Sequence, residues 1–290
     1  MKVSGFTLVR NAVKYDYPIA EAITSVLPLC DDFVVNVGKC DDGTLELVRS
    51  ISSPKIKIFE SEWNDHLREG GKLLAVETNK AFDQISSDSN WAVYIQADEV
   101  LHEKFLEITS KGMRDHKEDE DVEGLLFKYI HFYGNYNYVG NSRRWYRNEV
   151  RIIKNDNRIR SYRDAMGFRK SEKKLKVKPL DACLYHYGWV KPPDAQQAKQ
   201  KTFHKLWHND KKAAALSGEE IQFDYSNIDG LEVFKGSHPG VMKKRIERLN
   251  WNFNYDPSKN KLSLKNSFLK NIENFTGWRP GEYKNYQLLT

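Results

Sequence analysis

The stretch DFVVNVGKCDDGTLELVRSI, residues 32–51, contains in one unit the pattern that decides the fold. Its apolar run 32–38 predicts a buried strand, and 42–51 predicts a helix that follows an acidic turn. The same alternation surrounds it, with strands predicted at 3–9, 55–59 and 91–96 and helices at 18–29 and 69–82. Because these runs lack a period-2 alternation, the strands are expected to be buried on both faces of a parallel sheet. The first hundred residues therefore predict a doubly wound α/β architecture.

The pattern changes after residue 116. Strands are predicted at 124–134, 149–155 and 174–188, and helices at 194–208 and near 239–250. Two prolines in VKPPD, residues 190–194, favour a boundary at this point. We therefore predict a first domain over 1–190, with a mostly parallel twisted sheet flanked by helices, and a helical or irregular extension over 191–290.

The composition is that of an ordinary globular protein, with 40% apolar and 30% charged residues in a chain of 290. The first residues have too short an apolar run for a signal peptide, and no stretch approaches the ~20 apolar residues of a membrane-spanning helix. The three cysteines, Cys30, Cys40 and Cys183, form neither a disulfide framework nor a zinc pattern. These features predict a cytoplasmic protein.

The net charge of +6 is unevenly distributed. Residues 1–145 carry 17 Lys and Arg against 24 Asp and Glu, a balance of −7, whereas residues 146–290 carry 29 against 16, a balance of +13. A basic half can meet a nucleic acid, an anionic membrane or a phosphorylated substrate, or can simply be a solvated surface. No nucleic-acid-binding motif accompanies the charge, so we expect no nucleic-acid partner and leave a peripheral membrane contact open.

Polar residues follow the predicted strands at their carboxyl ends, where ligands bind in open parallel α/β sheets. Arg10 follows the first strand, and Asp41 and Asp42 follow the second. These two acids suit either a helix cap or a contact with a nucleotide. Arg68 and Lys72 flank two glycines before a helix, where they are either phosphate contacts or surface charges.

The fourth strand leads directly into QADEV, residues 96–100. Starting the next helix accounts for Glu99 and Glu103, but it gives no reason for Asp98 at the strand tip. Hard cations such as Mg²⁺ or Mn²⁺ prefer carboxylate and phosphate oxygens, which makes Asp98 a candidate ligand. His186, in LYHYGWVKPP, follows a later strand and is either a core histidine or a second ligand that faces Asp98.

Taken together, these motifs resemble the family-2-type glycosyltransferases with the GT-A fold. The resemblance covers roughly residues 1–190 and rests on DDGT at 41–44, the glycine-containing segment 68–79, IQADE at 95–99 and YHYGWV at 185–190. It implies transfer of a sugar from a nucleotide-sugar donor to an acceptor that is a glycan, a lipid or a protein.

The resemblance also implies roles for individual residues. The donor would be contacted by Arg10, Asp41, Asp42, Arg68, Lys72, Gln96 and Asp98. A divalent cation, Mn²⁺ or Mg²⁺, would be held by Asp98 and His186 and would neutralise charge on the departing diphosphate.

The sequence departs from the family pattern at Gln96, where the family usually has Asp. A neutral amide adds no charge at the metal and is expected to hydrogen-bond the ribose. For the base that activates the acceptor hydroxyl, Asp164 in SYRDAMGF is the first candidate and Glu149 in RNEVRI the second. An ion pair of Asp164 with Arg160 or Arg163 is the alternative to a catalytic role.

Three functions compete on this pattern. The first is a metal-assisted glycosyltransferase, and the second is a nucleotide-sugar-binding or scaffold protein on the same fold that has lost catalysis. A nucleotidyltransferase ranks third, because LVRNAVKYDYP at residues 8–18 has no glycine-rich loop after the first strand.

Overall fold

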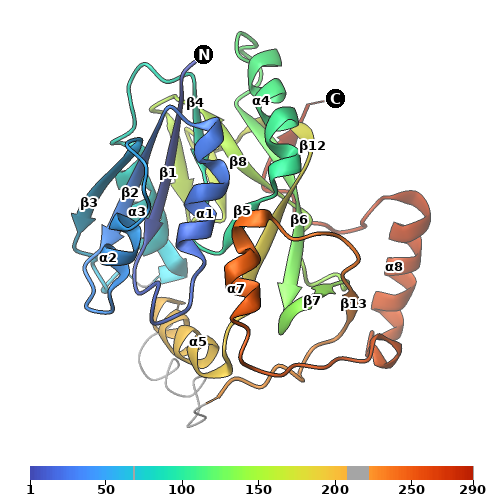
Figure 1. The fold of residues 1–290 in the computed structure, drawn as a ribbon. Coiled ribbons are helices and arrows are strands. Elements are labelled where there is room, and N and C mark those ends of the chain that lie inside the picture. Colours follow the sequence, from blue (N-terminus) through green and yellow to red (C-terminus); the bar gives the residue numbers. More distant parts are fainter. Residues whose placement is uncertain (68, 208–221, 290) are drawn as a thin grey trace.

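The apolar runs of the first hundred residues form parallel strands, seen on the left of Figure 1, that make up one half of the main sheet. The computed structural model describes residues 1–67, 69–207 and 222–289. The helices of the described residues are α1 (Ile19–Val26), α2 (Thr44–Arg49), α3 (Lys72–Phe82), α4 (Leu106–Asp115), α5 (Pro193–Trp207), α7 (Lys243–Glu247) and α8 (Leu264–Thr276). The first seven strands are β1 (Val3–Val9), β2 (Asp32–Gly38), β3 (Ile56–Ser61), β4 (Trp91–Tyr94), β5 (Glu99–Leu101), β6 (Gly124–Tyr133) and β7 (Asn135–Gly140). The others are β8 (Asn148–Lys154), β9 (Ile159–Tyr162), β10 (Gly167–Lys170), β11 (Lys173–Lys174), β12 (Lys176–Trp189), β13 (Leu231–Val233) and β14 (Gln287–Leu288).

The main sheet has the order β13-β7-β6-β8-β4-β1-β2-β3. Strands β4, β1, β2 and β3 run parallel, whereas β8 joins β4 and β6 in antiparallel orientation. Strand β12 pairs in parallel with β6 and antiparallel with β5. The predicted α/β class, a core sheet flanked by helices, is confirmed.

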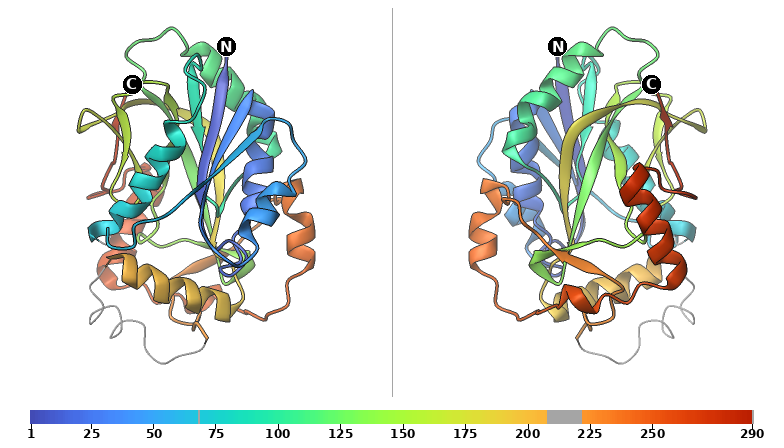
Figure 2. Two further views of the ribbon diagram at one scale, coloured as in Figure 1. Left: turned by 90° about the vertical axis from the view of Figure 1, so that its left-hand side faces the viewer. Right: turned by 90° about the vertical axis from the view of Figure 1, so that its right-hand side faces the viewer.

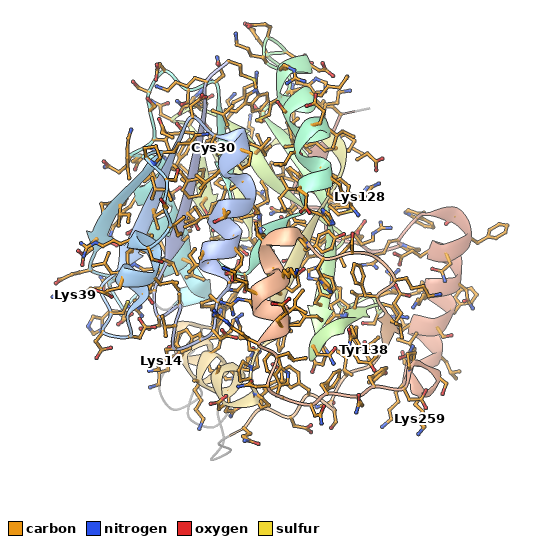
Figure 3. The ribbon with its side chains drawn as sticks, viewed as in Figure 1. Lys14, Cys30, Lys39, Lys128, Tyr138 and Lys259 are labelled. Carbon is orange, nitrogen blue, oxygen red and sulfur yellow. The ribbon has the colours of Figure 1, made fainter. Side chains whose placement is uncertain are left out.

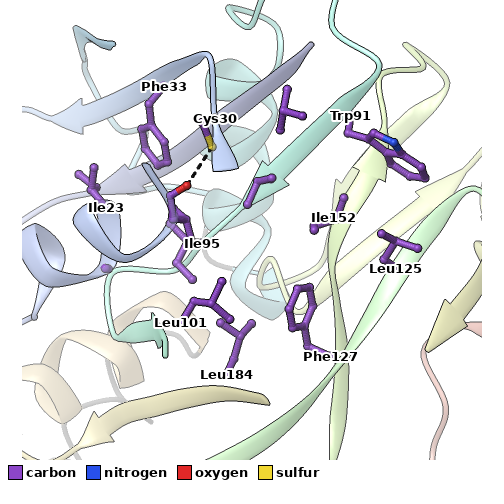
Figure 4. Close-up of a cluster of buried hydrophobic side chains, with 14 of the residues drawn as sticks. Ile23, Cys30, Phe33, Trp91, Ile95, Leu101, Leu125, Phe127, Ile152 and Leu184 are labelled. Carbon is purple, nitrogen blue, oxygen red and sulfur yellow. Dashed lines mark hydrogen bonds between the residues drawn. The ribbon is translucent and has the colours of Figure 1, made fainter. Parts of the chain in front are cut away.

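The core strands are buried on both faces because alternate side chains enter different clusters. In β2, Phe33, Val35 and Val37 enter one cluster with residues of α1, and Val34 enters the other with residues of α3. Figure 4 shows the first cluster, where Phe33 lies beside Cys30 and Ile23. Figure 2 shows α1 and α3 on opposite faces of the sheet. Continuous apolar runs therefore became strands covered from both sides.

Several elements were not predicted from sequence. These are β5, β7, β13, β14, the separate three-stranded sheet of β9, β10 and β11, and helix α8. Residues 43 and 71, glycines with φ of 85° and 73°, precede α2 and α3, and both adopt the left-handed conformation that glycine tolerates. The division into domains 1–190 and 191–290 remains a prediction. In the described part of the chain, no helix is long and apolar enough to cross a membrane.

Candidate functional site

A cavity of about 520 Å³ opens beyond the carboxyl ends of β1 and β4. Arg10 enters it directly after β1, and Gln96 and Asp98 enter it after β4. Helix α5 contributes a further wall through Lys199 and Phe203. The cavity therefore occupies the place where an open parallel sheet normally binds its ligand.

Six of the predicted site residues line this cavity. They are Arg10, Gln96, Asp98, Glu149, Asp164 and His186. They come from strand ends, from β8, from the turn between β9 and β10, and from β12, so the fold brings together residues separated by up to 176 positions.

The other predicted donor contacts lie elsewhere or are not described. Asp41 and Lys72 are exposed and, like Asp42, are not among the described residues that line the cavity. The Asp42 carboxylate accepts hydrogen bonds from the Lys14 amide at 2.8 Å and the Thr44 hydroxyl at 2.6 Å, which order the turn before α2. Arg68 lies outside the described residues. A nucleotide contact for these four residues remains a prediction.

Asp98 is buried and is held by a lysine from α5. Its Oδ2 accepts a hydrogen bond from Lys199 Nζ at 3.2 Å, and its Oδ1 lies 3.8 Å from His186 Nε2. Burial alone would raise the pKa of Asp98, but the surrounding positive charges, Lys199 above all and Lys191 behind it, together with the Lys199 hydrogen bond outweigh burial and hold that pKa well below its usual range. Asp98 is therefore an ionised carboxylate inside the cavity wall.

Lys199 is itself fixed from several sides. Its ammonium also donates to the Gly188 carbonyl at 3.1 Å and lies 5.0 Å from the centroid of the Tyr17 ring. A second buried lysine, Lys191, donates to the Asp16 carbonyl, and burial lowers its pKa well below the usual value. The site thus already contains a cation, supplied by the protein and paired with Asp98.

A pair of histidines determines the tautomer of His186. The register of β6 and β12 places His131 beside His186, with 3.1 Å between their Nδ1 atoms. His131 Nε2 lies 2.7 Å from the Tyr146 carbonyl, which can only accept, so His131 carries its proton on Nε2. Burial lowers the pKa of His131 to about 3 and that of His186 to about 4, so both rings are neutral. His186 therefore donates from Nδ1 and turns an unprotonated Nε2 toward Asp98.

The donor set fits a divalent cation only in part. His186 Nε2 and Asp98 Oδ1 face each other at 3.8 Å and are the two candidate metal donors. A Cβ added to Gly188 would lie 2.6 Å from Nε2 and 2.7 Å from Oδ2, so this glycine keeps the space beside both groups open. Within residues 1–67, 69–207 and 222–289, no group of three or more His, Cys, Asp or Glu side chains is arranged for a metal. Two protein donors suit Mg²⁺ or Mn²⁺ when substrate phosphates and water complete the shell.

Glu99 has a structural role and does not start a helix, so that expectation is wrong. It opens β5, where its completely buried carboxylate accepts hydrogen bonds from Arg151 Nη2 and from the Tyr129 hydroxyl, each at 2.8 Å. The backbone amide of Gln96 donates a hydrogen bond to the same carboxylate at 3.1 Å. This buried ion pair fixes the backbone on both sides of Asp98.

The two base candidates lie in different surroundings. Glu149, on β8, is buried, and burial raises its pKa to about 7. Asp164 lies in a tight turn between Arg163 and Ala165, whose φ angles of 54° and 59° are unusual for residues other than glycine. Burial also raises the pKa of Asp164, and its Oδ1 is buried without a hydrogen-bond partner among the described residues.

Gln96 supports the Asp164 turn. Its side-chain amide donates to the Ala165 carbonyl at 3.2 Å, which an aspartate at this position could not do. On the other side, a Cβ on Gly71 would lie 2.6 Å from the Asp164 Cβ, so the start of α3 packs directly against the turn. An amide at position 96 thus has a local structural reason.

Sequence reasoning missed three residues of the site: Lys199, His131 and Trp63. Lys199 is one of several basic residues in α5, and His131 is one of many aromatic or polar residues in β6, so neither stood out. Trp63 follows β3, and its ring lies 4.6 Å from the Arg10 guanidinium. Because a side chain on Gly38 would overlap Trp63, the glycine at the end of β2 is what admits this ring.

Comparisons with known proteins are limited to distant structural similarity. Neither a protein-family model nor a curated protein sequence matches the chain. S. aureus TarS 1–349 in complex with UDP has a TM-score of 0.40 and 15% identity, covering 71% of this chain and 65% of that chain. Glucosyl-3-phosphoglycerate synthase from Mycobacterium tuberculosis, in complex with Mn²⁺, UDP and phosphoglyceric acid, has a TM-score of 0.31 and 17% identity, covering 45% and 43%.

A third solved structure shows a similar level of likeness. This is 4-diphosphocytidyl-2C-methyl-D-erythritol synthase from Anaerococcus prevotii, with a TM-score of 0.35 and 7% identity, covering 53% of this chain and 71% of that chain. The chain spans less than two thirds of the TarS fragment and 39% of the longer TarS structure. These proteins are similar in fold to this chain, and no activity follows from the likeness.

Proposed function

We propose that this protein is a glycosyltransferase that binds a nucleotide-sugar in the cavity beyond β1 and β4 and transfers the sugar to a glycan, lipid or protein acceptor. The observation that carries the proposal is the convergence of six residues, predicted from separate sequence motifs, on one cavity at the carboxyl edge of a parallel sheet. That edge is the usual binding place in this architecture.

The cavity divides into a nucleoside end and a diphosphate end. Arg10 and Trp63 stack on each other at the ends of β1 and β3 and offer planar surfaces to a base. Asp98, His186 and Lys199 form the end suited to a diphosphate. If a divalent cation binds, Asp98 and His186 would hold it, and it would supply Lewis-acid charge. Lys199 adds a positive charge of the protein's own for the departing diphosphate.

For the acceptor base we propose Asp164, with Glu149 as the second candidate. Asp164 presents a buried oxygen to which no described residue donates a hydrogen bond, which leaves it able to accept the proton of an acceptor hydroxyl. Glu149, with a pKa of about 7, is half ionised near neutral pH and is also suited to proton transfer. Asp164→Asn and Glu149→Gln, compared by turnover and by donor binding, separate the roles, because the base variant loses turnover while it still binds donor.

The proposal is tested by calorimetry with a panel of nucleoside diphosphates, with and without Mn²⁺. We expect the wild type to bind at least one of them, and Asp98→Asn to weaken the Mn²⁺ enhancement. Asp181→Asn is the matched control, since Asp181 is an exposed surface partner of Lys128 on another part of β12. Absence of binding to every member of the panel would contradict the proposal.

A second candidate function is a nucleotide-sugar-binding or scaffold protein without catalysis. It is favoured by Lys199, which occupies one oxygen of Asp98, and by the neutral Gln96. Donor hydrolysis or transfer by the wild type, lost in Asp164→Asn or Asp98→Asn, would rule it out. Donor binding without any turnover over a broad acceptor panel would favour it.

A further inference from the structure

Helix α8 carries large apolar side chains on a face that nothing in the described structure covers. Leu264, Phe268 and Phe275 are 92%, 66% and 93% exposed, and Trp278 beyond the helix end is 64% exposed. At about 100° per residue, positions 264, 268 and 275 fall within about 40° of one another. They therefore form one stripe, and Figure 1 shows α8 standing at the side of the molecule.

The opposite side of α8 is firmly attached to the body of the protein. Glu273, about 180° from Leu264 on the helix, pairs with Arg279 at 2.8 Å, Arg143 at 3.2 Å and Arg147 at 3.3 Å. Its side chain is only 14% exposed. Because these ion pairs fix the orientation of α8 about its own axis, the apolar stripe on the opposite side faces away from the body of the protein.

The charge around the stripe is predominantly positive, although the half-exposed Asp256 lies 3.6 Å from Lys259. From 257 to 290 the sequence contains six basic residues against two acidic ones, Glu273 and Glu282. Both acids are turned toward arginines of the body, with Glu282 paired to Arg147 at 2.7 Å. Lys261 and Lys265 are exposed on either side of Leu264, and Figure 3 shows Lys259 at the same end of the helix.

We propose that this α8 surface, comprising Leu264, Phe268, Phe275 and Trp278 with the lysines at 259, 261 and 265, docks onto an anionic lipid membrane. A helix with Phe, Leu and Trp on one face and lysines at its border is the pattern of an interfacial helix that lies in the plane of the membrane. Lysines close to an anionic leaflet add attraction that salt weakens. A second copy of this chain would bring the same positive charges together, which disfavours a homodimer.

The surface is connected to the cavity rim. Arg279 donates to the Trp145 carbonyl at 2.7 Å, and the next residue, Tyr146, lines the cavity. Docking through α8 would therefore hold this side of the cavity toward the lipid surface. The docking proposal stands without the proposed function, since it depends only on α8 and the residues that flank it.

The test is co-sedimentation of the full chain with vesicles of phosphatidylcholine, with or without phosphatidylglycerol, at low and high salt. We expect binding to the anionic vesicles, weakened by salt. Phe268→Ser/Phe275→Ser should reduce binding by about tenfold or more, because two aromatic side chains lose their burial in the interface. Lys261→Glu/Lys265→Glu should reduce it by roughly tenfold and remove the salt dependence.

Controls separate docking from folding and from self-association. Val13→Ser, at an apolar residue that is 51% exposed elsewhere on the surface, should leave vesicle binding unchanged. If the phenylalanine variant lowers the melting temperature, its reduced binding could reflect unfolding. The lysine variant removes no packed group, so its vesicle binding then tests the docking proposal. Failure of the wild type to bind anionic vesicles, or unchanged binding by both variants, would overturn the proposal. So would a stable dimer in light scattering that the phenylalanine variant dissociates.

Discussion

Replacing Lys199 by methionine removes the cation that neutralises Asp98 while keeping the length and most of the volume of the side chain. In the wild type the two groups are 3.2 Å apart, and their side chains are 10% and 11% exposed. Breaking a buried ion pair from one side leaves an uncompensated charge and typically costs about 3–5 kcal/mol. We therefore expect Lys199→Met to lower the free energy of unfolding by about 3 kcal/mol near pH 7.

The pH dependence of this loss follows from the pKa of Asp98. In the wild type that pKa is depressed, so Asp98 contributes stability above the ordinary carboxyl pKa, and this contribution is lost as the pH falls through the depressed value. Without Lys199 the pKa rises, because burial then acts with less opposition. The variant takes up the proton at a higher pH than the wild type and loses its buried charge. The difference in the free energy of unfolding between the wild type and the variant should therefore shrink as the pH falls from about 7 to about 4.

Urea unfolding of both proteins across this range measures the difference in the free energy of unfolding. Asp98→Asn in the Lys199→Met background completes a double-mutant cycle and should recover part of the loss. Lys128→Met, which breaks the exposed pair with Asp181, should have little effect at any pH. A small difference for Lys199→Met that does not change with pH would refute the assignment of Lys199 as the counter-charge of Asp98.

Three further perturbations test the neighbouring groups. Because burial raises the pKa of Glu149 to about 7, the wild type should lose stability as the pH rises through 7, and Glu149→Gln should remove that slope in urea unfolding. Gly188→Ala places a methyl group 2.6 Å from His186 Nε2 and 2.7 Å from Asp98 Oδ2, so these two buried groups must shift. Calorimetry should show weaker Mn²⁺-dependent binding of a nucleoside diphosphate, and the melting temperature should fall. Arg151→Met leaves its buried carboxylate partner unpaired and should destabilise the fold by about 3–5 kcal/mol in urea unfolding; a loss under about 1 kcal/mol would contradict the role assigned to this pair.

The local elements of the first hundred residues follow closely from the sequence. The predicted strands 3–9 and 32–38 coincide with β1 and β2, and the predicted helix 69–82 covers the segment that ends with α3. This succeeds because strands buried on both faces require uninterrupted apolar runs, which can be read without knowledge of their partners. Strand β7 and the small sheet of β9, β10 and β11 escaped prediction because their stability comes from pairing with other segments.

The site shows the same division. Asp98 was selected because it follows a buried strand. His186 was also expected just after a strand, but it lies inside β12, and the pairing of β12 with β5 brings the two side chains together. Glu99 was misread because its partner, Arg151, is 52 residues away and leaves no local trace in the sequence. Lys199, 101 residues from Asp98, could not be distinguished from the other lysines of a basic helix.

The sequence by itself determined the α/β class, the order of the core elements and which residues stand at the strand ends, since each depends on local apolar runs and on residues next to them. Only the tertiary structure decided which charges meet. It placed a lysine on Asp98, directed the unprotonated Nε2 of His186 toward the same carboxylate, and turned the apolar face of α8 outward. Those outcomes depend on the crossing of distant strands and helices, and electrostatic energy in a buried site depends on separations of a few ångströms that no local pattern records.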